Sequence, residues 1–124
     1  MMFHRSIIGI ICMVIVLGGC AGTPLTVPAQ TVKMTSAGFE PASPQIVLNQ
    51  EVCWKNDDAQ DRWPASNIHP SHEIYPEFDP GDHIKPGDTW CFTFYQEGIW
   101  QFHDHLLPEF GGVVVVGSHK IHVQ

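Results

Sequence analysis

Four histidines stand in two close pairs, and imidazole is the commonest protein ligand for copper and zinc. His103 and His105 are separated by one residue at the end of the aromatic stretch GIWQFH. Side chains two positions apart on an extended strand share a face, so both rings can address one ion. His69 and His72 are three positions apart, a spacing that suits a turn presenting both rings together. The four residues together predict a metal site built from imidazoles.

Two carboxylates and three further histidines can be divided, by their positions, into residues that could assist the site and residues that lie apart from it. Glu73 and Asp104 adjoin the paired histidines, so they could orient the rings by hydrogen bonds or complete the coordination sphere. Either could also serve as the general base of a zinc hydrolase, but the chain has no HExxH motif. We interpret His83, His119 and His122 as solvated, and metal binding by the last two, in the C-terminal tail, would be adventitious.

The first twenty residues have the layout of an export signal, MMFHRSIIGIICMVIVLGGC. Their apolar run is too short to favour a spanning helix. The ending LGGC resembles the lipobox of bacterial lipoproteins, in which the cysteine, here Cys20, becomes lipid-modified and is the new N-terminus. The resemblance implies a protein of the cell envelope, anchored by lipid at the periplasmic or extracellular face of a membrane. The predicted divisions are a signal peptide over 1–19, a tether over 20–30 and a folded domain over 31–124.

The acidic balance of the chain argues against a nucleic acid partner. The formal net charge is −7 with neutral histidines, and it becomes −8 when Arg5 is removed with the signal peptide. Nucleic acid binding depends on clustered lysine and arginine side chains that neutralise phosphates.

Two further cysteines, Cys53 and Cys91, have matching positions in their strands. In EVCWKN the apolar Val52 and Trp54 alternate with Cys53, and in TWCFTF the aromatic residues alternate with Cys91. Both cysteines therefore point to the outer face of a sheet. An exported protein lies where disulfides persist, so we predict a cross-strand disulfide if these strands are neighbours.

Short runs with strand character, separated by Gly, Pro and Asn, dominate the chain, and no long segment has helical periodicity. This spacing predicts an all-β sandwich or small barrel with Greek-key connections. The connection over 57–83 shows little strand pattern and contains four prolines, which predicts a functional loop held in one shape. The predicted strands are 30–35, 45–50, 51–56, 89–95, 98–103 and 112–117.

The order of these signals resembles the cupredoxin family, in particular plastocyanin and amicyanin. The resemblance covers residues 31–117 and is carried by the segments IKPGDTWCFTF and GIWQFHDHLLPEFGGVVVV. It implies a cupredoxin-like Greek-key β-sandwich with a metal site at one end. In the family, blue copper is held by a histidine before the PG, to which His72 can be matched, and by Cys, His and Met in the last loop. Those three positions carry Asp104, Leu107 and Phe110 here.

Without a thiolate, a strong copper–sulfur bond and its intense blue colour are not expected. We therefore predict a pale, non-blue copper site held by His72, His103 and His105, with His69 as a fourth ligand; zinc could occupy the same set. Binding should weaken as the pH falls through the imidazole range near ~6.5. The expected role is copper handling or electron transfer with a membrane-bound redox or copper-handling partner. The alternatives are a metal-free interaction module, with the histidines packed against Trp63, Tyr75 and Trp100, and a Cu/Zn-dependent enzyme.

Overall fold

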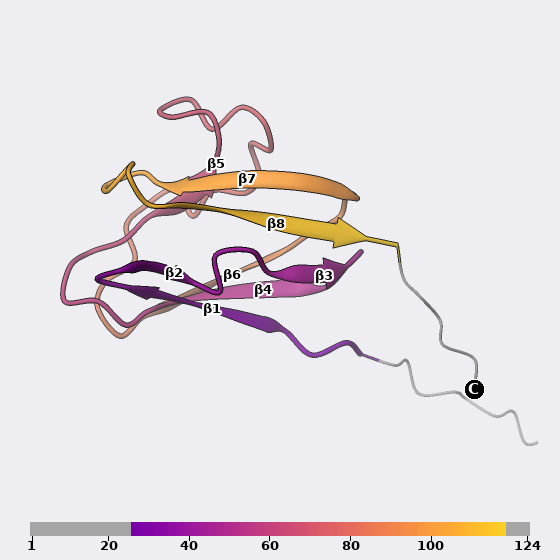
Figure 1. Ribbon diagram of the computed structural model, residues 1–124, viewed down its shortest axis with the longest axis horizontal. Coiled ribbons are helices and arrows are strands. Elements are labelled where there is room, and N and C mark those ends of the chain that lie inside the picture. The colour runs from indigo at the N-terminus through magenta and orange to yellow at the C-terminus, as the bar shows by residue number, and fades with distance from the viewer. Residues whose placement is uncertain (1–25, 119–124) are drawn as a thin grey trace, which may run out of the picture.

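The computed structural model describes residues 26–118 and arranges them as two four-stranded sheets packed face to face (Figure 1). The first sheet has the order β2-β1-β4-β6, and the second has the order β3-β8-β7-β5. β1 lies parallel to β4 and β3 lies parallel to β8, whereas the other neighbours are antiparallel. The strands are β1 Gln30–Thr35, β2 Gly38–Glu40, β3 Gln45–Val47, β4 Glu51–Asn56, β5 Pro64–Ser66, β6 Thr89–Thr93, β7 Gly98–Asp104 and β8 Gly111–Gly117. The predicted all-β sandwich is confirmed.

An aromatic core fills the space between the sheets. Trp54 of β4 is fully buried and its ring lies 4.9 Å from Phe78, 6.3 Å from Phe94 and 5.8 Å from Phe102, measured between centroids. Rings of this size each bury some 150–250 Å², so a small domain can be held together by a few of them. Phe78 comes from the long connection between β5 and β6, and its burial fixes that connection to the core.

The predicted disulfide is confirmed. Cys53 and Cys91 are directly opposite in the register of β4 and β6, and they form a disulfide on the outer side of the first sheet. Both strands alternate as expected, because Val52 and Trp54 are buried while Cys53 is half-buried and Cys91 exposed. The cysteine sulfurs of the described residues are thus joined to each other and cannot act as thiolate ligands.

The long connection after β4 contains more structure than its composition predicts. Arg62 forms a bridge with Ile84, and β5 pairs with the end of β7. Strands β2 and β5 are only three residues each, too short to show an alternating pattern in the sequence. Beyond β5 the chain rises in a loop beside β5 and β7 before it crosses to β6 (Figure 1). Within residues 26–118, no helix is long and apolar enough to cross a membrane.

Candidate metal centre

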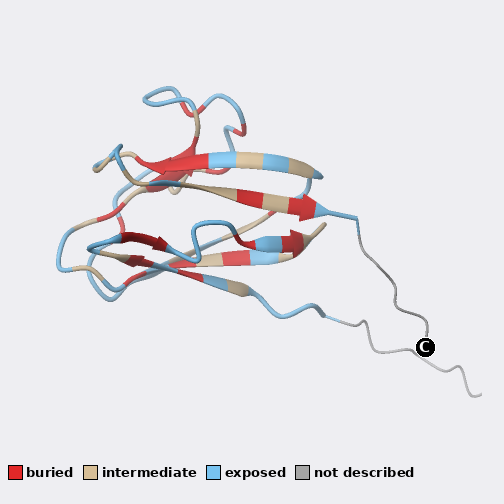
Figure 2. Cartoon of the chain, in the orientation of Figure 1, coloured by how far each residue is buried: buried red, intermediate tan, exposed pale blue. Residues whose placement is uncertain are grey.

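The paired histidines lie where β7 ends beside β5. His103 is opposite Ala65 of β5 in the register, and the amide of His105 donates to the carbonyl of Trp63 at 2.7 Å. Successive side chains of a strand point to opposite faces. Since Phe102 lies in the core, His103 and His105 project from the other side of the strand end. β7 changes along its length from alternating exposure to full burial over its last three residues (Figure 2).

The loop after β5 brings the second histidine pair to the first. The four ligand nitrogens of His69, His72, His103 and His105 all lie within 4.8 Å of one another. His69 Nδ1 is 3.1 Å from His103 Nε2, and His72 Nε2 is 2.9 Å from His105 Nδ1. With metal–nitrogen bonds of ~2.0 Å, neighbouring ligand nitrogens around one ion are roughly 3 Å apart. The arrangement therefore has the dimensions that a single metal ion requires, and the four histidines of both pairs are brought together.

The ring of His72 is oriented by Asp79, a residue that no local sequence pattern indicates. His72 Nδ1 is 2.5 Å from the Asp79 carboxylate, which also accepts hydrogen bonds from Trp63 Nε1 and the Gly81 amide, each at 2.8 Å. An ionised carboxylate only accepts, so Nδ1 must carry the proton and Nε2 is left as a lone pair. This lone pair faces the other three rings. A histidine held by a carboxylate on its far nitrogen is the common arrangement at protein metal sites.

Asn67 orients His103 in the same way. The His103 Nδ1 hydrogen donates to the side-chain oxygen of Asn67 at 2.9 Å, which leaves Nε2 free to face His69. Only 6% of His103 and 6% of His72 remain exposed, so both rings are held within the protein. Two of the four imidazoles thus have their proton placed on the outer nitrogen and a lone pair directed to the centre.

Electrostatics favour the neutral form of His103 and His105. Burial, followed by the neighbouring His72, His69 and His105, lowers the pKa of His103 from 6.5 to about 4. Burial, with His72 and His69, also lowers the pKa of His105. Burial alone would raise the pKa of Asp79, but hydrogen bonds from Gly81, His72 and Trp63 outweigh it and hold that pKa below its ordinary value. A carboxylate beside neutral imidazoles is the protonation state that a cation needs.

Neither of the two carboxylates expected to assist the histidines makes a hydrogen bond to a histidine ring among the described residues. Glu73 is exposed, and the carboxylate that orients His72 is Asp79 instead. Asp104 points to the opposite side of β7 from His103, because the two residues are adjacent on a strand. The Asp104 carboxylate accepts hydrogen bonds from Arg62 Nε at 2.5 Å and from the amides of Trp63, Leu106 and Leu107. Its role in the structure is to hold the loop after β7 and to neutralise Arg62.

The interior beside Asp104 is occupied by Arg62. Both side chains are fully buried, and the guanidinium carbon lies 5.3 Å from the Phe39 ring centroid and 5.1 Å from that of Phe110. Asp58 pairs with the same guanidinium at 3.2 Å. A metal ion in this space would have to displace a buried positive charge that already has two carboxylate partners. Any metal held near the end of β7 is therefore expected on the outer, histidine-bearing side.

Other groups of the described residues do not offer a second metal site. Glu51 lies close to Cys53 and Cys91, but the sulfurs there are joined in the disulfide. His83 is exposed and pairs with Asp82 and Asp61, outside the cluster. His119 and His122 lie outside the described residues.

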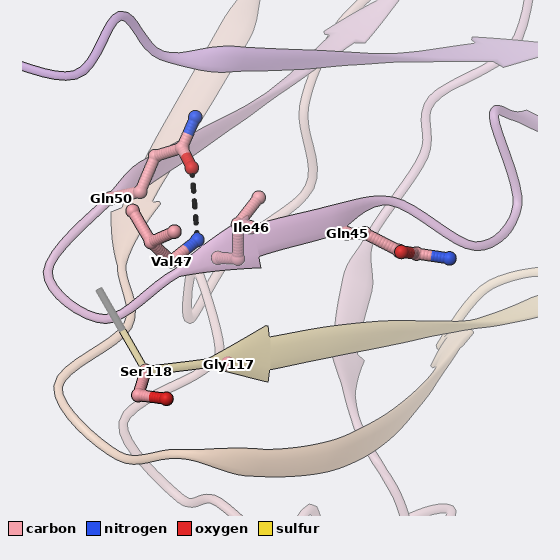
Figure 3. Close-up of a pocket in the computed structure, with 6 residues that line it drawn as sticks. All are labelled: Gln45, Ile46, Val47, Gln50, Gly117 and Ser118. Atoms are coloured by element: carbon pink, nitrogen blue, oxygen red, sulfur yellow. Dashed lines mark hydrogen bonds between the residues drawn. The ribbon is translucent and has the colours of Figure 1, made fainter. Parts of the chain in front are cut away.

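A surface pocket lies at the far end of the second sheet (Figure 3). Its wall includes Val47, Gln50 and Gly117, and the side-chain oxygen of Gln50 accepts a hydrogen bond from the Val47 amide at 3.1 Å. Since β8 runs from Gly111, which is opposite His103, to Gly117, the pocket is roughly 20 Å from the histidines. It carries no group that would serve the metal centre.

No protein-family model matches the sequence, and no curated protein matches it. Solved structures do match the fold. A purple cupredoxin from Nitrosopumilus maritimus is 20% identical, with 71% of this chain and 99% of that chain covered and a TM-score of 0.63. A Cu(I) form of an amicyanin variant is 21% identical over 72% of this chain and 82% of that chain, again with a TM-score of 0.63. A reduced form of another amicyanin variant is 19% identical over 76% of this chain and 87% of that chain, with a TM-score of 0.64.

The fold is that of the cupredoxins. The match of His72 to the family's first ligand stays a prediction. His72 lies with His69, His103 and His105, whereas the residue that faces Asp104 is Arg62. The four histidines and Asp104 are thus on opposite sides of the end of β7. This cupredoxin-like domain has its cluster of potential ligands outside the sandwich rather than in the core beside Asp104.

Proposed function

We propose that this chain binds copper at a non-blue site formed by His69, His72, His103 and His105, and that it serves in copper handling at the cell envelope. One observation carries the proposal: four ring nitrogens converge within 4.8 Å, and two of the rings have their outer nitrogen held by Asp79 and Asn67. Imidazole ligands suit Cu(II). When bound, copper would supply a site for ligand exchange and one-electron chemistry.

Copper handling fits the donors better than electron transfer does. Thiolate and thioether ligands favour Cu(I), and the cluster offers nitrogen donors alone. A site that binds the two oxidation states so unequally is poorly suited to fast redox cycling. We keep a membrane-bound copper-handling protein as the expected partner and Cys20 as the expected lipid attachment site.

The alternative of a metal-free module explains fewer of the contacts. It expects the histidines to pack as structural groups against three aromatic residues. His105 does lie against Trp63, with 4.8 Å between ring centroids. Tyr75 and Trp100 instead pack against each other, also at 4.8 Å. At 2.9–3.1 Å, the lone pairs on His103 Nε2 and His72 Nε2 can accept an N–H from His69 and His105 in the metal-free protein or bind a cation in its place.

Metal analysis of the mature protein without a histidine tag tests the proposal. We expect one copper per chain, weak d–d absorption and a wide parallel hyperfine splitting in the electron paramagnetic resonance spectrum. The double variant His103→Ala/His105→Ala should lose tight binding while keeping the fold, because the core is formed by other residues. His83→Ala and His119→Ala/His122→Ala are the controls and should bind as the wild type does.

Three results would contradict the proposal. The wild type could retain no copper, it could retain zinc in preference to copper, or the double variant could bind copper as tightly as the wild type. In the last case the C-terminal tail variant would show whether the ion is held there.

A further inference from the structure

The four imidazoles of the proposed copper site are not held equally. His72 and His103 are each buried and each bonded on the outer nitrogen, to Asp79 and Asn67. His105 is partly exposed, its amide is bonded to the carbonyl of Trp63, and its ring packs on the Trp63 indole. These three ligands are therefore positioned by groups that do not belong to the site.

His69 is held only from within the site. It is exposed, and its ring contacts are with His103 and His105, at centroid distances of 5.0 Å and 4.9 Å. The hydrogen bond found for its ring is the one to His103 Nε2, an atom that a bound metal would take. The preceding residue, Ile68, is 54% exposed, so the backbone here runs along the surface. With copper bound, the described residues leave the His69 ring without an orienting partner of its own.

From these contacts we infer that His69 is the exchangeable ligand of the site. The inference rests on the proposed copper-binding function and specifies which ligand a copper-exchanging partner would replace first. His72, His103 and His105 would retain Cu(II), while the bond from copper to His69 would break and a bond to an incoming neutral nitrogen donor would form in its place. The oxidation state of copper does not change, and no proton is transferred. The group that enters is an unprotonated imidazole presented by a copper-exchanging protein.

The buried histidines, His72 and His103, cannot be the exchangeable ligand. An incoming donor at the position of His103 would have to enter where only 6% of the side chain is exposed, and it would separate His103 from Asn67, its partner on the outer nitrogen. His69 is exposed, so a donor that replaces it could approach directly from solvent. His72 and His103 are retained because they are buried and bonded on their outer nitrogens, and His105 is retained because its backbone and ring are held by Trp63.

Chemical rescue with imidazole tests this inference on the mature protein without a tag. His69→Ala should keep one Cu(II) per chain with an altered electron paramagnetic resonance spectrum, and millimolar imidazole should restore the wild-type spectrum. Release of copper to EDTA, followed by stopped-flow absorption, should be faster than in the wild type by about tenfold or more. His103→Ala should lose tight binding, and imidazole should not restore it. His83→Ala is the matched surface control and should behave as the wild type in both measurements.

Two outcomes would overturn the inference even if the protein binds copper. His69→Ala could lose copper as completely as His103→Ala does, which would make His69 a retaining ligand. Alternatively, His69→Ala could match His83→Ala in spectrum and in release rate, in which case His69 is not a ligand. A wild type that binds no copper would instead refute the proposed function, and this inference with it.

Discussion

At the scale of single residues, Asp79 decides which nitrogen of His72 can bind a metal. Its carboxylate accepts from His72 Nδ1 and is itself fixed by Trp63 and Gly81. Groups of this kind orient a ligand and raise its basicity, and removing them typically lowers metal affinity about 10–100-fold. Asp79 would thus act on a bound ion through the ring of His72.

The first prediction is that Asp79→Asn weakens copper binding by about 10–100-fold without unfolding the domain. Asn keeps an acceptor oxygen but loses the charge that supports the His72 ring. Competition titration against a chelator of known affinity measures the change. Asp82→Asn is the control, since Asp82 is exposed and bonds to His83 outside the cluster. Equal affinities for the two variants would show that Asp79 does not support the site.

Arg62 and Asp104 form a buried ion pair on which the stability of the domain is expected to depend. Both are fully buried, so removing Arg62 leaves Asp104 without its compensating charge, and removing Asp104 leaves Arg62 with Asp58 alone. Losing one partner of a buried pair typically costs about 3–5 kcal/mol, whereas replacing both is far less damaging.

The second prediction is a double-mutant cycle in the metal-free protein. Asp104→Asn keeps an oxygen for the amides of Trp63, Leu106 and Leu107, and it should lower the free energy of unfolding by about 3 kcal/mol or more. Arg62→Leu should be similarly costly. The double variant should lose less than the sum of the two, as measured by urea unfolding. Additive losses would mean that the charges are not coupled.

At the scale of elements, β7 separates two environments at its end. Phe102 and Asp104 face the interior, while His103 and His105 face the loop that follows β5. That loop presents His72 with a φ of 55°, a left-handed conformation that costs a residue other than glycine roughly 1–2 kcal/mol. Strain of this kind persists where the surroundings determine the backbone, and it is often found at functional sites. Here it places the ring between Asp79 and His105.

The pairing of β4 with β6 carries the third prediction, which concerns the disulfide. The bond joins residues 38 apart in the sequence. Constraining a loop of this length in the unfolded chain stabilises a protein by about 3–4 kcal/mol in the chain-entropy model. Cys53→Ser/Cys91→Ser should lower the free energy of unfolding by that amount and leave copper affinity unchanged, because the disulfide lies on the other sheet from the histidines. A loss of copper binding at temperatures where the variant is folded would contradict this separation.

At the scale of the whole molecule, the fourth prediction concerns the proposed lipid anchor on Cys20, which lies outside the described residues. The mature protein should partition into the detergent phase of a Triton X-114 separation. Cys20→Ser should block lipid attachment, so that the protein is recovered in the aqueous phase or remains unprocessed. The copper affinity of the soluble domain should equal that of the anchored protein. An unmodified cysteine in a fully aqueous wild type would refute the anchor.

Much of this protein could be predicted from the sequence because the signals concerned are local. Alternation along 51–56 and 89–95 placed Cys53 and Cys91 on outer faces, and the structure joins them. The spacing of His103 and His105 put both rings on one side of a strand, and they lie there. These features depend on the period of two in a strand, which a short stretch of sequence already contains.

Only the tertiary structure decided which side chains meet the histidines. Asp79 is one of several carboxylates in the long connection, and its local pattern does not distinguish it from Glu73, which is nearer to His72 in the sequence. Likewise nothing near Arg62 in the sequence indicates Asp104, 42 positions further along, as its partner. Such contacts depend on the path of a loop that is fixed by the burial of Phe78 and Tyr75 in the core. A strand has a period, whereas the path of an irregular loop is set by packing against elements distant in the chain.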